Sequence, residues 1–251
     1  MASVPVVVTE DLTKIYRHQV AVDRLSFTVN EGEIFGFLGP NGAGKTTTLL
    51  MLLGLTEPSS GRARILGIDP AREPIKVKAK VGYLQENMGF YSDLTARQML
   101  RFVADLNAIG RREAEARIEN ALAEVGLADE DPPKKIAAFS RGMRQRLGIA
   151  ELLIKDARVA FLDEPTLGLD PDATQRISEL IQRLAREQRM TIVLSSHQLH
   201  QVQKICDRVG IMIKGRMVAN GPIEQLAREK FGVDRDEFTL EEIYMKYFLE
   251  G

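Results

Sequence analysis

The sequence predicts an α/β fold built on a largely parallel β-sheet, with a helical segment inserted into it. Ile34–Leu38 is almost entirely apolar, which is typical of a strand covered on both faces. Strands predicted at Val159–Asp163 and Thr191–Ser195 flank a helix predicted at Pro171–Arg186, the order of a parallel sheet with crossover helices. Across Thr95–Gly126 the apolar spacing becomes that of helices, which places the insert there.

The remaining elements follow from local patterns. Leu25, Phe27 and Val29 alternate with polar residues, which predicts a half-buried strand. The apolar strand after it leads into a glycine-rich loop and then a predicted helix at Thr46–Leu53. A last hairpin is expected around Lys214-Gly215.

Composition limits the class of protein. The 251 residues fit one large α/β domain, or one domain with a helical insert. The 34 Lys and Arg nearly balance the 35 Asp and Glu, which argues against a nucleic-acid partner because such proteins carry a basic excess. Cys206 is the single cysteine, so no intramolecular disulfide can form and a reducing cytosol is the expected compartment.

No secretion or membrane-spanning segment is predicted. Met1–Glu10 has no basic region before its apolar stretch, so no signal peptide is expected. No apolar run approaches the ~20 residues that cross a bilayer. Any action at a membrane is therefore expected to go through a partner.

A phosphate-binding loop follows the first buried strand. Its pattern is two glycines followed by Lys and Thr at full P-loop spacing, in Gly39, Pro40, Asn41, Gly42, Ala43, Gly44, Lys45 and Thr46. Glycines let backbone N–H groups surround phosphate oxygens, and the helix that follows directs its positive end at the same anion. Lys45 is expected to reach the terminal phosphates and Thr46 to bind Mg²⁺, with Thr47 beside it in the same site.

Two adjacent carboxylates end a later apolar strand. Val159–Leu162 leads directly into Asp163 and Glu164. Two carboxylates side by side repel unless a positive group lies near them, and Mg-ATP supplies one. Asp163 is expected to support the metal and Glu164 to polarise the attacking water.

These motifs, in this order, resemble the ATP-binding cassette of ABC transporters over nearly the whole chain. The resemblance implies a P-loop NTPase core with a parallel sheet, an N-terminal antiparallel β part and a helical subdomain. It makes residues 1–251 a single cassette, with a core at 1–89 and 156–221, a helical subdomain at 90–155 and a C-terminal helical tail at 222–251.

The resemblance also assigns roles outside the P-loop. Tyr16 stands where the family places an aromatic ring that stacks on adenine, and Gln85 resembles the Q-loop glutamine that contacts Mg²⁺ and faces the membrane partner. Ser195-Ser196-His197 resembles the switch region, in which the histidine hydrogen-bonds the γ-phosphate, and Gly168–Asp170 resembles the D-loop. Lys45, Glu164 and His197 are thereby the expected catalytic residues.

The signature loop departs from the family pattern of Ser-Gly-Gly-Gln. Ser140 and Gly142 match it and are expected to bind the γ-phosphate, whereas Arg141 replaces a glycine and Met143 replaces the glutamine. A long cation beside ATP can either aid binding or obstruct closure of the site, and the sequence leaves both open.

In the family, the signature loop of one cassette completes the P-loop site of another. The resemblance therefore implies a homodimer enclosing two ATP molecules and a separate transmembrane permease, with the cassette peripheral on the cytoplasmic face of the membrane. Phe139–Arg146 is similar to subunits that power export of drugs or small solutes. The tail after Pro222 is expected either to pack on its own domain or to contact a partner.

Two other function classes remain as alternatives. A non-transport cassette of the chromosome type needs a long coiled coil between Lys45 and Ser140, but these are 140 − 45 = 95 residues apart and show no sustained heptads. Translation-type members usually carry two cassettes, and no Asn-Lys-x-Asp guanine-recognition motif is present. The altered signature also allows a regulatory module that binds ATP without hydrolysing it.

Overall fold

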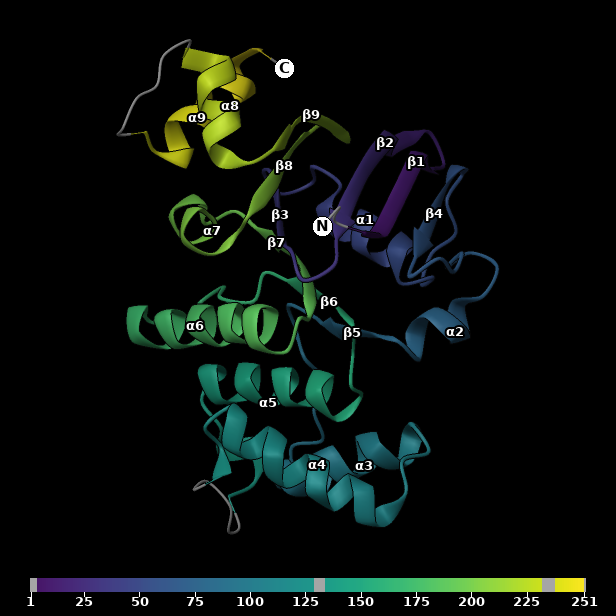
Figure 1. Ribbon diagram of the computed structural model, residues 1–251, viewed down its shortest axis with the longest axis vertical. Helices are drawn as coiled ribbons and strands as arrows, with labels where there is room; N and C mark the ends of the chain where they lie inside the picture. The colour runs from purple at the N-terminus through teal and green to yellow at the C-terminus, as the bar shows by residue number, and fades with distance from the viewer. Residues whose placement is uncertain (1–3, 129–133, 232–237, 251) are drawn as a thin grey trace.

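The computed structural model describes residues 4–128, 134–231 and 238–250, and within these the strands form two sheets (Figure 1). The larger sheet has six strands in the order β5-β6-β7-β3-β8-β9, and all of its neighbours are parallel except β8 and β9. Its strands are β3 (Ile34–Leu38), β5 (Val81–Leu84), β6 (Val159–Asp163), β7 (Thr191–Ser196), β8 (Arg208–Ile213) and β9 (Arg216–Gly221). The predicted parallel sheet and its C-terminal hairpin are thus confirmed.

The smaller sheet is the antiparallel N-terminal part that was expected. It consists of β1 (Pro5–Tyr16), β2 (Gln19–Asn30) and β4 (Ser60–Ile65), in the order β2-β1-β4. Phe27 of β2 stacks on Phe35 of β3 with ring centroids 5.4 Å apart, so the two sheets share one core. Helix α1 (Lys45–Leu52) contributes its buried Leu49 to that core.

Helices cover the opposite face of the large sheet. Besides α1, the described residues form α2 (Pro74–Lys78), whose Val77 joins the core shared with the small sheet, and α3 (Ala96–Leu106), α4 (Arg111–Glu124), α5 (Arg141–Ile154), α6 (Pro171–Glu187), α7 (Leu199–Ile205), α8 (Ile223–Phe231) and α9 (Leu240–Glu250). Along β6, Phe161 belongs to the core under the small sheet, while Leu162 belongs to the core under the helices. The continuous apolar run of this strand therefore reflects two covered faces.

Helices α3, α4 and α5 stack at the end of the molecule opposite to α8 and α9 (Figure 1). Thr95 and Gln98 form a reciprocal capping box that starts α3. Ile118 and Leu122 of α4 are fully buried, whereas Glu119 lies at the surface, 2.7 Å from Arg97 of α3. The charged stretch of α4 is thus a solvated helix face tied by surface ion pairs.

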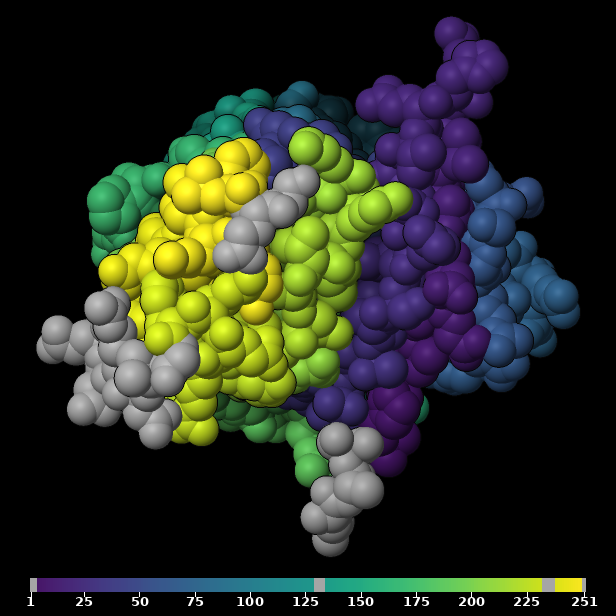
Figure 2. Space-filling view, turned by 90° about the horizontal axis from the view of Figure 1, so that it is seen from above, coloured from purple at the N-terminus to yellow at the C-terminus, as the bar shows by residue number. Residues whose placement is uncertain are grey.

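The C-terminal tail packs on its own chain. Leu240 and Ile243 of α9 are fully buried, and Gln203 of α7 accepts a 2.8 Å hydrogen bond from the Leu240 backbone N–H. The Gln203 amide also donates to the Phe238 carbonyl at 3.2 Å. In Figure 2, which views the molecule from above, the tail covers one side, and the strands β8 and β9 separate it from the N-terminal sheet.

No helix among the described residues combines the length and the apolar character needed to cross a bilayer. The longest, α6, has 17 residues and carries charged side chains on its outer face.

We expect Glu151 of α5 to make stability fall as the pH rises. Burial raises its pKa from 4.5 to about 7, although Lys155 acts in the opposite direction. Between these two values the folded chain holds a proton that the unfolded chain has lost, so the free energy of unfolding decreases by up to about 3 kcal/mol. Glu151→Gln should remove this loss in urea titrations between pH 5 and 8.

The matched control is Glu187→Gln, at an exposed position at the end of α6. It should keep the pH dependence of the unmodified chain. Equal pH profiles for the unmodified chain and Glu151→Gln would show that the buried carboxyl does not titrate in this range.

Candidate nucleotide-binding site

The P-loop lies between the end of β3 and the start of α1. Gly44 takes a left-handed conformation with φ of +101°, and a Cβ atom there would lie 2.4 Å from the Ala21 carbonyl oxygen. Only glycine fits this position, because any side chain would be strained and would overlap the backbone. The loop borders a cavity of about 310 Å³ that all the predicted P-loop residues from Asn41 to Thr47 line.

Lys45 is buried at the inner end of this cavity. Its ammonium group donates to the Gly39 carbonyl at 2.7 Å and to the Pro40 carbonyl at 3.2 Å. Burial lowers the pKa of Lys45, and the charges of Glu164 and Asp163 oppose that effect. A desolvated cation held by carbonyl oxygens is ready to exchange those weak partners for phosphate oxygens.

Asp163 ends β6 with its carboxylate surrounded by hydroxyl groups. Ser195 donates to Asp163 Oδ1 at 2.5 Å, and Thr46 donates to the same oxygen at 3.2 Å. Burial raises the pKa of Tyr83 to about 12, and the charge of Asp163 and its hydrogen bond with Tyr83 add to this. The carboxylate and the Thr46 hydroxyl are hard oxygen donors, which fit Mg²⁺.

Glu164 lines the cavity and contacts His197, which is not itself among the lining residues. Glu164 has φ of +49°, and its backbone N–H donates to the Ser195 hydroxyl at 3.1 Å. Its carboxylate is 9% exposed, and Oε2 lies 2.9 Å from Nδ1 of the partly exposed His197. The fold thus places the three expected catalytic side chains around one cavity or directly beside it.

At the end of β5, Gln85 does not line the nucleotide cavity. Leu84 is buried and Gln85 is exposed, as expected of successive residues in an extended segment. Glu86, rather than Gln85, lines the nucleotide cavity. The Mg²⁺ contact of Gln85 therefore stays a prediction that needs a change in this loop.

Tyr16 lines the same cavity, with Lys14 Nζ 4.9 Å from its ring centroid.

The signature residues lie outside the cavity. Ser140 caps α5 by accepting a 3.2 Å hydrogen bond from the Met143 N–H, and neither Ser140 nor Gly142 lines the nucleotide cavity. Arg141 reaches the D-loop of its own chain, because a Cβ atom on Gly168 would lie 2.9 Å from Arg141 Nη1. The side chain that replaces a glycine of the family pattern therefore lies against Gly168.

Five residues of this site carried no predicted role: Gln19, Ala21, Tyr83, Glu86 and Ser195. Ser195 pairs with Asp163 across β6 and β7, and that register was not visible in the sequence. A hydroxyl at the end of the strand before His197 was the available signal.

Comparison with known proteins identifies the family. A family model described as ABC transporter matches residues 22–167, which is more than half of the chain. The chain belongs to the ABC transporter family. It is 42% identical over 223 residues to the bacitracin transport ATP-binding protein BcrA of Bacillus licheniformis, covering 89% of this chain and 72% of that relative.

Solved structures agree with this assignment. The structure of an ATP-binding subunit of an ABC transporter matches this chain with a TM-score of 0.85 and 31% sequence identity. The match covers 97% of this chain and 99% of that one. Another, cbiO1 of Clostridium perfringens, described as part of the transporter complex cbiONQ, has a TM-score of 0.82 and 26% identity and covers 98% and 99% of the two chains. The predicted P-loop fold is confirmed, and the chain is an ATP-binding subunit and ATPase of the ABC family.

We expect Gly44→Ala to weaken nucleotide binding by roughly tenfold or more, because a strained left-handed residue costs about 1–3 kcal/mol even without the overlap with Ala21. Titration with a fluorescent ATP analogue measures this affinity. Gly89→Ala is the control, since a Cβ atom there meets nothing within 4 Å. Unchanged affinity of Gly44→Ala would mean that the loop conformation described above is not the one that binds nucleotide.

Proposed function

We propose that two copies of this cassette close on two Mg-ATP molecules and drive a separate transmembrane partner, in the direction of export. One observation carries the proposal. Residues 41–47 of the P-loop and the acid pair line one cavity and His197 contacts Glu164, whereas Ser140 and Gly142 do not line it. A second cassette that presents its signature loop to this cavity would complete the site.

The proposed chemistry assigns one task to each side chain. Lys45 transfers its hydrogen bonds from the Gly39 and Pro40 carbonyls to the terminal phosphates. Thr46 and Asp163 would hold Mg²⁺, which neutralises phosphate charge when bound. Glu164 orients a water molecule and accepts its proton as the water oxygen attacks the γ-phosphorus and the bond to ADP breaks.

His197 faces a constraint set by its contact with Glu164. A neutral imidazole that donates Nδ1–H to the Glu164 carboxylate has only an acceptor at Nε2. Donation from Nε2 to the γ-phosphate therefore requires either a protonated ring or release of Glu164. We infer that ATP binding separates this pair, which frees the carboxylate for the attacking water.

The dimer would be held together by its substrate. The phosphates offer charge-assisted hydrogen bonds to the P-loop of one copy and to Ser140 and Gly142 of the other. Hydrolysis and loss of phosphate remove these bonds, so the pair opens. Ser140 is an exposed residue, as this contact requires, and Arg141 lies along Gly168 of its own chain.

The surface beside the Asn87–Asp93 loop fits a membrane partner. Tyr91 is 55% exposed and Leu106 of α3 is 70% exposed. Phe102 contacts the edge of Tyr91 with ring centroids 5.4 Å apart. An exposed aromatic patch next to the strand end that carries Gln85 suits a docking helix of a permease on the cytoplasmic face of the membrane. The likeness to a bacitracin transport protein supports export.

The assay that tests the dimer is ATP hydrolysis by the purified chain at rising protein concentration. Activity per subunit should rise with concentration, since each site needs residues from two copies. Glu164→Gln should lower kcat by at least about 100-fold and retain ATP binding, because it removes the proton acceptor but keeps the shape of the side chain.

Glu187→Gln, a surface substitution on α6, is the matched control and should hydrolyse ATP normally. Activity that is independent of concentration would exclude the shared site. Normal turnover by Glu164→Gln would exclude Glu164 as the base.

The docking surface can be tested by truncating its two aromatic rings. The Tyr91→Ala, Phe102→Ala double variant should retain basal ATPase activity and lose most of the stimulation by the membrane protein of the neighbouring gene in lipid vesicles. Met245→Ala, at a half-exposed position on α9, is the control. Full stimulation of the double variant would place the partner elsewhere.

A further inference from the structure

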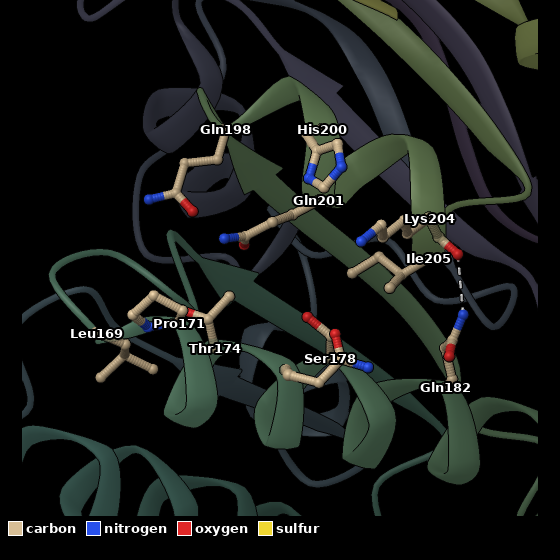
Figure 3. Close-up of a pocket in the computed structure, with 11 residues that line it drawn as sticks. Leu169, Pro171, Thr174, Ser178, Gln182, Gln198, His200, Gln201, Lys204 and Ile205 are labelled. Atoms are coloured by element: carbon tan, nitrogen blue, oxygen red, sulfur yellow. Dashed lines mark hydrogen bonds between the residues drawn. The ribbon is translucent and has the colours of Figure 1, made fainter. Parts of the chain in front are cut away.

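A polar groove of about 510 Å³ separates the starts of α6 and α7 (Figure 3). Gln198 and Gln201 extend from the α7 side toward Leu169 and Pro171 of the D-loop side. The groove therefore runs between the loop that follows Glu164 and the helix that follows His197. Gln201, one of the residues that line the groove, also contacts the segment that follows Glu164.

Thr166 provides the anchor on the Glu164 side. It lies two residues beyond Glu164, and its side chain is buried, with the residue 4% exposed. Its hydroxyl donates to Gln201 Oε1 at 2.6 Å, and Gln198 Oε1 lies 3.4 Å away. One hydroxyl carries one proton, so the short contact with Gln201 is the hydrogen bond that uses it.

Gln201 is four residues beyond His197, within the first turn of α7. On the other side of His197, Ser195 is fixed by its 2.5 Å bond to Asp163. The turn between them is shaped by the Gln198 N–H, which donates to the Ser196 hydroxyl at 3.0 Å. His197 is thus carried on a short span whose two ends are both tied to the loop that bears Asp163, Glu164 and Thr166.

This arrangement restricts how far the backbone that carries His197 can move away from the acid loop. The imidazole and the Glu164 carboxylate lie 2.9 Å apart, and the His197 side chain is 44% exposed, so nearly half of its surface meets solvent. A displacement of about 1 Å in a reacting group can cost up to 100-fold in rate. The bond between Thr166 and Gln201 limits such displacement by holding the first turn of α7 against the acid loop.

We propose that Gln201 is a positioning residue for ATP hydrolysis, acting through its hydrogen bond to Thr166 to hold the backbone of His197 beside the acid loop, where its ring can reach the γ-phosphate once ATP has separated it from Glu164. The proposal rests on the proposed role of His197. Gln201 does not line the nucleotide cavity, so it acts on turnover and leaves nucleotide binding to the P-loop.

Steady-state ATPase kinetics of the full chain test this. Gln201→Leu and Thr166→Val should each lower kcat about tenfold, with KM for ATP and the melting temperature little changed. Gln201→Glu keeps an acceptor oxygen and Thr166→Ser keeps the hydroxyl, so both should recover most of the rate. The double variant Gln201→Leu, Thr166→Val should be no slower than either single one, because both remove the same bond.

Gln175→Leu is the matched control, because Gln175 lines the same groove but bonds only to Glu179 on its own helix. It should retain the normal kcat. An unchanged kcat for Gln201→Leu would overturn the proposal. So would a rise in KM for ATP as large as the fall in kcat, or additive effects in the double variant.

His197→Ala, measured in the same assay, distinguishes the proposed role of Gln201 from the proposed role of His197 on which it rests. Normal turnover by His197→Ala would remove the role of His197, and with it the basis for Gln201. A slow His197→Ala beside a fast Gln201→Leu would keep the role of His197 and reject Gln201 as its support.

Discussion

The hydrogen bond from Ser195 to Asp163 joins the two strand ends on which the chemistry of this cassette depends. Its length is 2.5 Å, and it links β6 and β7 at the residue pair where their ladder ends. The Ser195 hydroxyl also accepts from the Glu164 N–H, which fixes the direction in which that carboxylate leaves the strand. Asp163, Glu164 and His197 are therefore placed by one register of a fully buried parallel sheet, which cannot slip without exposing its apolar faces.

Charge and burial at the site favour a phosphate ligand. Lys45 has lost solvent, and its present partners are carbonyl oxygens, which are weaker acceptors than phosphate. The two carboxylates that oppose its desolvation also repel one another, and a metal-bound nucleotide relieves that repulsion. Because the signature residues lie outside the cavity, the proposed dimer would supply part of the binding energy from a second surface. In that proposal, nucleotide binding and dimer closure are one process.

Helix α7 connects the hydrolytic pair with the rest of the chain. Gln201 ties its first turn to Thr166, while Gln203 binds the start of α9. Gln182 of α6 donates to the Lys204 carbonyl at the other end of the same helix. Through these attachments the seven-residue helix links the segment that carries His197 to α6 and to the C-terminal tail.

Contiguous motifs were determined by the sequence alone. The P-loop, the strand that ends in Asp163 and Glu164, and the Ser-Ser-His segment each need only local spacing, and the apolar runs predicted the parallel sheet because buried strands lack polar alternation. The tertiary structure decided what depends on the register between distant strands and on the direction of side chains. In the structure, Glu86 and not Gln85 lines the cavity, and Tyr83 and Ser195 hydrogen-bond to Asp163. Arg141 lies against Gly168, and Thr166 donates a hydrogen bond to Gln201. These contacts join residues that are mostly far apart along the chain, and local patterns carry no information about which of them will meet.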